Sequence, residues 1–314
     1  MSDRQELVVV PAPDEAVAAA FAAILADLNS PESVRAYRQE WRRFVDVLTA
    51  RGINPLAART FDVQTYLLGL RAAGKKASTR ARALAVIRTV YAALARQDVL
   101  KGANPAREAK NPKGDTGAAR TPWLTEEQLK RFLAPVPTYG FVGPRDYLIA
   151  LALALTGLRR AEVARIEVDD ITATPDGHYL RVRVKGNKHG VVKLVAPLAA
   201  ALAAWAARWE IATGPLFPRS RTNRRAVGVG TVRNAVKRQA ARAGFTTVEA
   251  ELISPHAFRR TLATLADQRG VSKEQIQRGF LHSNVRTTER YMKLGHAPTA
   301  PADALIDLIP AHLR

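Results

Sequence analysis

Apolar residues recur at intervals of three and four through most of residues 15–107, and this period predicts helices there. One helix is expected to begin at Ser30-Pro31-Glu32, where a hydroxyl N-cap precedes proline and an acid in the first turn. Another is expected from about Ser78 to Gln97, with its apolar residues on one inner face. The apolar stripes of these two helices consist of Val34, Tyr37, Trp41, Phe44, Val45 and Leu48, and of Leu84, Ile87, Tyr91 and Leu94.

The hydrophobic period is interrupted between residues 104 and 122, where Asn-Pro and Lys-Gly-Asp sequences with almost no apolar content predict a linker. A second domain is then expected to open with a capping box, because the Gln128 side chain can reach back to the Thr125 backbone. This domain has a mostly helical pattern, but residues 180–185 alternate apolar and basic side chains, which is the period of a strand. A turn at 186–190 and a return strand directly after it complete a predicted hairpin.

These patterns predict a mainly α fold with a small β-hairpin or sheet (α+β), divided into two domains. We expect a flexible tail at 1–14, a helical domain at 15–107, a linker at 108–122 and a mixed domain at 123–314. With 314 residues, of which 47% are apolar, the chain is long enough to bury a sizeable core in each domain.

Composition narrows the class of protein further. The sequence contains no cysteine, which excludes disulfides and cysteine–zinc sites. No secretory signal is visible in the first ten residues. The longest apolar stretch, 148–158, is far shorter than the roughly 20 residues that a membrane-spanning helix needs. We therefore expect a cytoplasmic protein that works at the nucleoid and has no membrane partner.

The formal net charge of +20 indicates a polyanionic partner, because each neutralised phosphate releases condensed counterions. Residues 211–248 contain no acidic side chain at all, which favours a DNA-facing element over a solvated surface. A basic surface kept for solubility, or a ribosome-associated protein, is the alternative explanation. The side chains that we predict to contact DNA are Arg80, Arg82 and Arg88, which are expected to face outward from one helix, and Arg224, Arg225, Arg233, Lys237 and Arg238.

Six further residues of the second domain form a chemical pattern. They are Arg159, Lys185, His256, Arg259, His282 and Tyr291. A tyrosine hydroxyl has a pKa of about 10, so its ionisation at pH 7 costs roughly 4 kcal/mol. A tyrosine that attacks a phosphate therefore needs positive charge and hydrogen-bond donors around it, and two arginine forks supply both. No group of carboxylates stands out as a two-metal site, which disfavours metal-dependent nucleases and transposases.

The local sequences around these residues are Thr156-Gly157-Leu158-Arg159-Arg160-Ala161-Glu162, Val184-Lys185-Gly186-Asn187-Lys188, Ser254-Pro255-His256-Ala257-Phe258-Arg259 and Leu281-His282. In this order and context, the set resembles the tyrosine recombinases (the phage integrase family), and most of all the compact Xer-type site-specific recombinases. The resemblance covers nearly the whole chain. It implies a clamp of two domains that closes around DNA, with a helical core-binding (SAM-like) domain at 15–107 and a catalytic domain at 123–314.

The resemblance also implies a role for each residue. The two arginines hold the scissile phosphate, Lys185 protonates the leaving 5′-oxygen, and the two histidines donate hydrogen bonds to the phosphate or accept the tyrosine proton. Tyr291 forms a covalent 3′-phosphotyrosyl bond that conserves the energy of the broken linkage, so rejoining requires no metal, ATP or other cofactor. Lys188 competes with Lys185 for the role of general acid.

The partner implied by the resemblance is double-stranded DNA with paired half-sites, on which the recombinase assembles as a homo- or hetero-tetramer. A second recombinase or a DNA translocase is a further partner that the family allows. In this family the segment after the tyrosine docks on a neighbouring subunit. Residues 301–313 are either such a segment or one that folds back onto its own domain.

Two positions depart from the usual family pattern. Phe280-Leu281-His282 stands where Leu-Gly-His is common, and Arg260 stands where a histidine is frequent. Neither removes a catalytic group, and both leave open a mobile-element integrase or transposase of the same family. A type IB topoisomerase and a DNA-binding protein without activity are two further classes to weigh against a recombinase. The helical N-terminal domain argues against the first, and the complete set of six residues argues against the second.

Overall fold

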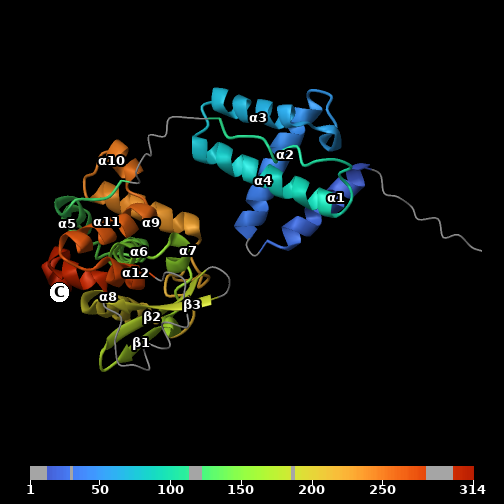
Figure 1. The fold of residues 1–314 in the computed structure, drawn as a ribbon. Coiled ribbons are helices and arrows are strands. Elements are labelled where there is room, and N and C mark those ends of the chain that lie inside the picture. The colour runs from blue at the N-terminus through green and yellow to red at the C-terminus, as the bar shows by residue number, and fades with distance from the viewer. Residues whose placement is uncertain (1–12, 29–30, 113–121, 185–187, 281–299) are drawn as a thin grey trace, which may run out of the picture. The chain divides into compact units, whose positions relative to one another are not determined.

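The computed structural model of the chain describes residues 13–28, 31–112, 122–184, 188–280 and 300–314. The chain divides into two compact units, Met1–Ala118 and Ala119–Arg314, and each is described by itself (Figure 1). Three of the predicted catalytic residues, Lys185, His282 and Tyr291, lie outside the described residues.

The first unit is helical. Its elements are α1 (Pro13–Ala26), α2 (Pro31–Thr49), the 3₁₀ turn η1 (Pro55–Ala57), α3 (Thr60–Ala72) and α4 (Ala77–Arg96). The sequence prediction for two of these helices is confirmed, since α2 begins at Pro31 and α4 lies within one residue of each expected end.

Helix α4 is the centre of this unit, because α1, α2 and α3 all pack against it (Figure 1). The predicted apolar stripes form the core or pack against it, apart from Val34. Trp41 meets Tyr91 edge to face, with 5.5 Å between ring centres, and Phe44 meets Tyr66 in the same way at 5.2 Å. Such aromatic pairs add to the free energy gained from burying the rings.

The second unit surrounds one buried helix with shorter helices and a small sheet. Its helices are α5 (Glu126–Leu133), α6 (Val142–Thr156), α7 (Arg160–Val163), α8 (Ala196–Arg208), α9 (Val229–Arg242), α10 (Thr247–Leu252), α11 (Pro255–Gln268) and α12 (Lys273–Gly279). Its remaining elements are the 3₁₀ turns η2 (Val168–Asp170), η3 (Pro301–Leu308) and η4 (Ala311–Leu313), and the strands β1 (Ile171–Thr174), β2 (Gly177–Val184) and β3 (Lys188–Leu194).

Helix α6 is the central element, and α7, α8, α9 and α11 pack around it (Figure 1). Every residue from Arg145 to Thr156 is buried, so this helix has no solvent-facing side over that length. It ends at Gly157, whose φ of 62° lies in the left-handed region and whose N–H bonds back to Leu153. Glycine adopts that conformation without the steric cost that a side chain brings. The termination directs the next residues, including Arg159, out of the core.

The capping box predicted at the start of this unit is confirmed. Gln128 donates its backbone N–H to the Thr125 hydroxyl at 3.2 Å, and the Thr125 N–H donates to the Gln128 side chain at 3.0 Å. These reciprocal bonds satisfy two backbone donors at the start of α5.

The three strands form an antiparallel sheet in the order β1-β2-β3. The predicted hairpin is confirmed. Its buried face carries Leu180 and Val182 on β2 and Val192 and Leu194 on β3, and Leu180 pairs with Val192. The predicted turn at 186–190 is too long, because β3 begins at Lys188, which pairs with Val184. Backbone pairing continues there although the apolar alternation has ended. Strand β1 was not predicted, since Ile171 is the single large apolar residue in it.

The last described residues fold onto their own unit. η3 packs on α5, α11 and α12, and Leu305, Leu308 and Ile309 enter the core of the second unit. Arg269, the residue after α11, holds this segment through hydrogen bonds to the Ala304 carbonyl at 2.6 Å and the Asp307 carboxylate at 3.1 Å. The structure therefore shows residues 301–313 folded back onto their own domain.

None of the helices in the described parts of the chain is both long enough and apolar enough to span a membrane.

Candidate active site

Arg159 stands at the point where the chain leaves the buried α6. It precedes the short helix α7, and its side chain is 49% exposed. Its guanidinium donates to Glu162 Oε1 at 2.8 Å, and its backbone N–H donates to Glu162 Oε2 at 2.7 Å. Glu162 is 7% exposed, so one buried carboxylate fixes both the backbone and the side chain of this arginine.

Arg259 reaches the same place from a different helix. It lies one turn into α11, which begins at Pro255 after the Ser254 hydroxyl accepts the Ala257 N–H at 3.3 Å. The Arg259 Nη1 donates to the carbonyl of Gly157 at 2.9 Å, and Nη2 donates to the carbonyl of Phe280 at 2.7 Å. The guanidinium Cζ lies 4.5 Å from the centre of the Phe280 ring.

The two arginines affect each other electrostatically. Burial lowers the pKa of Arg259 below its ordinary value, and the nearby charge of Arg159 lowers it further, while Glu162 opposes the shift. Two cations held together against their mutual repulsion are stabilised by an anion placed between them. A phosphate group has the charge and the acceptor oxygens that suit two arginine forks.

His256 lies on the same helix face as Arg259, because residues three apart on a helix are neighbours. It is exposed and stands in the first turn of α11, at the N-terminal end of the helix. The structure thus brings together three of the six predicted catalytic residues from two separate segments.

Glu162 and Phe280 contact these arginines, but no role for them was predicted from the sequence. The Arg-x-x-Glu spacing from 159 to 162 was a usable signal for Glu162, since it matches a capping box at the start of a short helix. For Phe280 the only signal was that a larger side chain stands where leucine is common.

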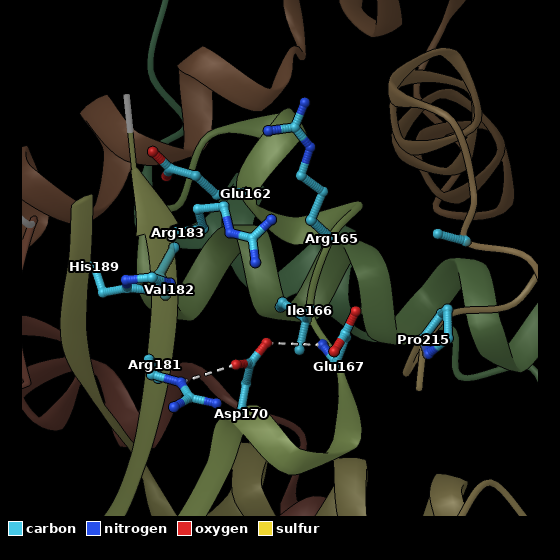
Figure 2. Close-up of a pocket in the computed structure, with 11 residues that line it drawn as sticks. Glu162, Arg165, Ile166, Glu167, Asp170, Arg181, Val182, Arg183, His189 and Pro215 are labelled. Carbon is cyan, nitrogen blue, oxygen red and sulfur yellow. Dashed lines mark hydrogen bonds and ion pairs between the residues drawn. The ribbon is translucent and has the colours of Figure 1, made fainter. Parts of the chain in front are cut away.

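A cavity of about 200 Å³ has Glu162, the anchor of Arg159, in its wall. Arg165 and Arg183 reach this cavity from the segment after α7 and from β2 (Figure 2). Arg181 is also in the wall, and it is paired with Asp170 at 3.2 Å. Arg165 and Arg183 have no ion pair among the residues that the structure describes, so the cavity has two available cations.

The expectation that Arg80 faces outward is wrong. Its residue is 3% exposed, and its guanidinium bonds to the Lys75 and Pro112 carbonyls, the latter at 2.9 Å. Arg88 is exposed, as expected, but its guanidinium also bonds to carbonyl groups, those of Ala106 at 2.9 Å and of Ala109 at 2.6 Å. The physical reason is that the irregular segment after α4 packs back on the helix, and its carbonyls need donors.

Arg82, the third arginine predicted on this helix, is exposed, and its contact with DNA stays a prediction.

Some basic side chains of residues 211–248 form ion pairs with acids from other parts of the second unit. Arg238 donates to Asp146 Oδ2 at 2.6 Å. Lys237 lies 3.4 Å from the Glu251 carboxylate, and Arg233 lies 4.0 Å from it. Acids from neighbouring elements thus pair with three of the predicted DNA contacts.

Arg224 and Arg225 remain exposed in the loop between α8 and α9, with Arg224 donating to the Trp209 carbonyl at 3.1 Å. The five DNA contacts predicted in the second unit stay predictions.

Two sequence profiles match the chain. Residues 122–297 match the phage integrase family, and residues 21–98 match the N-terminal SAM-like domain of phage integrases.

Among curated proteins, the chain is 30% identical to the tyrosine recombinase XerD of Bifidobacterium longum over 272 residues, which cover 82% of this chain and 85% of that one. It is 32% identical to XerC of Mycobacterium tuberculosis over 276 residues, which cover 84% and 88%.

Solved structures share the fold. A XerH recombinase bound to its difH substrate has a TM-score of 0.63 at 18% identity, covering 83% of this chain and 76% of that one. A lambda integrase fragment bound as a dimer to a core site has a TM-score of 0.63 at 17% identity, covering 86% and 95%. Together with the two arginines that converge on one point, the profile and the recombinase relatives show that the chain belongs to the phage integrase family and is a tyrosine site-specific recombinase.

Proposed function

We propose that this recombinase cleaves DNA with Tyr291 as its nucleophile and with Arg159 and Arg259 as the clamp on the scissile phosphate. The observation that carries the assignment is the convergence of the two arginines at the end of α6, where Glu162 fixes one and two backbone carbonyls hold the other. Donors fixed before the substrate arrives stabilise developing charge without reorganisation in the transition state.

The proposed reaction balances without an external energy source. The Tyr291 oxygen attacks phosphorus, the bond to the 5′-oxygen breaks, and Lys185 supplies the proton that the 5′-oxygen takes up. The tyrosine proton passes to one of the two histidines, His256 or His282. In the rejoining step a 5′-hydroxyl attacks the phosphotyrosine, the bond to tyrosine breaks, and the protons return.

We assign DNA binding to both units, with residues 15–107 as the core-binding domain and residues 123–314 as the catalytic domain. A tail at 1–14 and a linker at 108–122 complete this division. Exposed cations support the assignment in the second unit, namely Arg165 and Arg183 in the wall of the cavity and Arg224 and Arg225 in the loop before α9. Each phosphate that they neutralise steepens the salt dependence of binding.

Assembly on paired half-sites belongs to the same proposal. A lambda integrase tetramer bound to a Holliday junction shares the fold, with a TM-score of 0.62 at 15% identity. We infer that four recombinase subunits act together on DNA at the nucleoid, either four copies of this chain or this chain with a second recombinase. A DNA translocase is a further candidate partner.

The test is a nicked suicide duplex taken from the DNA that flanks the gene, incubated without magnesium and analysed on a denaturing gel. We expect a covalent protein–DNA band that Tyr291→Phe abolishes, because phenylalanine lacks the attacking oxygen. Mapping the cut would give the target site. A band that persists in Tyr291→Phe would refute the nucleophile. Wild-type protein that binds the duplex without a band would refute autonomous cleavage at that site.

A further inference from the structure

Phe280 contacts the phosphate-binding arginine in two ways. Its ring lies against the guanidinium of Arg259, with 4.5 Å between Cζ and the ring centre, and its backbone carbonyl accepts the Arg259 Nη2 at 2.7 Å. The residue follows α12 and is 5% exposed, and Arg259 is half-buried, so the contact is partly shielded from solvent. A cation over an aromatic face is stabilised more strongly when it is shielded from water.

The Phe280 ring also packs directly against Gly157. A Cβ built on Gly157 would lie 2.4 Å from Cε1 of the Phe280 ring, which is closer than real atoms approach. The absence of a side chain at 157 therefore makes the room that the ring occupies. The Gly157 carbonyl in turn accepts the Arg259 Nη1 at 2.9 Å. Glycine, ring and guanidinium form one packed joint between the ends of α6 and α12 and the start of α11.

We propose that Phe280 is a positioning residue that sets the plane of the Arg259 guanidinium for the DNA-cleavage reaction. The inference rests on the proposed function. The carbonyls of Gly157 and Phe280 hold two of the guanidinium nitrogens. The ring pressed against the flat face opposes a tilt of the guanidinium about the line that joins those nitrogens. The guanidinium is then oriented before a phosphate binds, which is the condition for electrostatic preorganisation.

The same unit contains a matched pair that serves as a control. The Arg131 guanidinium lies 4.2 Å from the centre of the Phe245 ring, and it also donates to two consecutive backbone carbonyls, those of Ala243 and Gly244. Phe245 is 7% exposed. Arg131 belongs to α5 and makes no contact with the arginine cluster in the described structure, so weakening this pair tests the general effect of losing a buried cation–π contact.

The first experiment replaces Phe280 with fluorinated phenylalanines of increasing fluorine content, which withdraw electron density from the ring face with little change in shape. We expect single-turnover cleavage of the suicide duplex to slow progressively, by roughly 2- to 30-fold at full effect. DNA affinity and the thermal midpoint should change little. The same series at Phe245 should leave the cleavage rate unchanged.

Phe280→Leu and Phe280→Tyr complete the set. Leucine fills space without a π face and should slow cleavage, whereas tyrosine keeps the ring face and should restore the rate relative to leucine. If the fluorinated series leaves the cleavage rate constant, or slows it equally at both positions, the positioning role of Phe280 is refuted.

A second readout does not depend on cleavage. In spectra of arginine side chains labelled with ¹⁵N, the Arg259 signal is identified by its loss in Arg259→Lys, and the ring current should displace it from the free-arginine position. Phe280→Leu should remove that displacement. A signal at the free-arginine position in wild-type protein would refute the contact, even if no Tyr291-dependent band is found. A band together with a normal ring-current shift but no fluorine effect would leave the proposed function standing and overturn this inference alone.

Discussion

The two ends of α6 carry arginines with opposite fates. Near the N-terminal end, Arg145 is 4% exposed, and its guanidinium bonds to Asp146 at 2.9 Å and to the Pro218 carbonyl at 3.1 Å. Asp146 is fully buried and also binds Arg238. Beyond the C-terminal end, Arg159 is half exposed and binds a single carboxylate.

The difference teaches that the protein's own acceptors decide what an arginine does. Where buried carbonyls and carboxylates use up the donors, the guanidinium joins segments of the fold. Where a guanidinium is half exposed and binds a single carboxylate, as Arg159 does, part of it stays open to an anion. Arg80 of the first unit belongs with Arg145, since it is buried and bonds to backbone carbonyls.

The largest effect on stability is expected at the N-terminal end of α6, where Arg145 is buried. Arg145→Ala leaves Asp146 buried with Arg238 as its remaining partner and frees the carbonyls of Pro218 and Arg219, so stability should fall by about 3–5 kcal/mol. Urea unfolding followed by fluorescence would measure the loss. The folded fraction, at saturating DNA, should cleave at a rate near that of wild type. A large loss of cleavage with normal stability would reverse the comparison.

The matching experiment removes an arginine beside the C-terminal end of α6. Arg259→Ala should slow cleavage by about 10²–10³-fold, equivalent to about 2.7–4 kcal/mol of transition-state stabilisation, because a preorganised donor set is removed. Stability should change much less than in Arg145→Ala, since no buried carboxylate loses its partner. Single-turnover kinetics and unfolding curves on the same preparations would decide. Equal losses of stability in the two variants would contradict the division between the two ends.

A finer test changes the acid that holds Arg159. Glu162→Gln keeps an acceptor for the Arg159 backbone N–H but removes the charge that steadies its guanidinium. We expect cleavage to slow by about tenfold, the lower end of the range for a hydrogen bond to a charged group. Glu162→Asp, which keeps the charge on a shorter arm, is the control. A rate for Glu162→Gln equal to that of wild type would show that Arg159 needs no anchor.

The smallest change in stability is expected at Arg269. This arginine binds two carboxylates near the surface, those of Glu126 and Asp307. Its hydrogen bond with Asp307 holds the pKa of that carboxyl below its ordinary value. A carboxyl with a folded-state pKa below the unfolded one stabilises the protein above the unfolded pKa, and this contribution disappears as pH falls through the folded pKa. Since Asp307 is 55% exposed, Asp307→Asn should cost at most about 1 kcal/mol at pH 7.

The pH dependence supplies the control for that variant. The gap between Asp307→Asn and wild type should close as pH falls below about 4, where the wild-type carboxyl also becomes neutral. Thermal midpoints recorded from about pH 7 down to about pH 2.5 would show it. A constant gap across that range would mean that packing of η3, rather than the ion pair, is lost.

Local signals in the sequence predicted the parts of the fold that local forces determine. The period of apolar residues located α4, the Thr125 capping box located the start of α5, and the alternation of apolar and basic residues located β2. Each of these depends on neighbours within one or two turns. Strand β1 was not predicted, because its residues show little apolar alternation and owe their conformation to pairing with β2.

Long-range partners explain what the sequence could not predict about the site. Arg80 looked like a surface residue because its helix position is polar, but the carbonyls that bury it include one from residue 112. The stretch without acids looked uncompensated because Asp146 and Glu251 lie outside it in sequence. The convergence of Arg159 and Arg259 near Gly157 likewise required the packing of α11 on α6.

The packing of Phe280 on Gly157 also constrains the order in which substitutions at these two positions can arise. At Gly52 and Gly74, φ is positive but the space around an added Cβ is open, so a substitution meets backbone strain alone. At Gly157 a substitution meets the strain and the ring together. Any replacement there becomes tolerable only after position 280 has already lost its aromatic ring. The two codons are therefore epistatic, and a recombinase lineage that keeps Phe280 is held to glycine at 157 by a residue more than a hundred positions away.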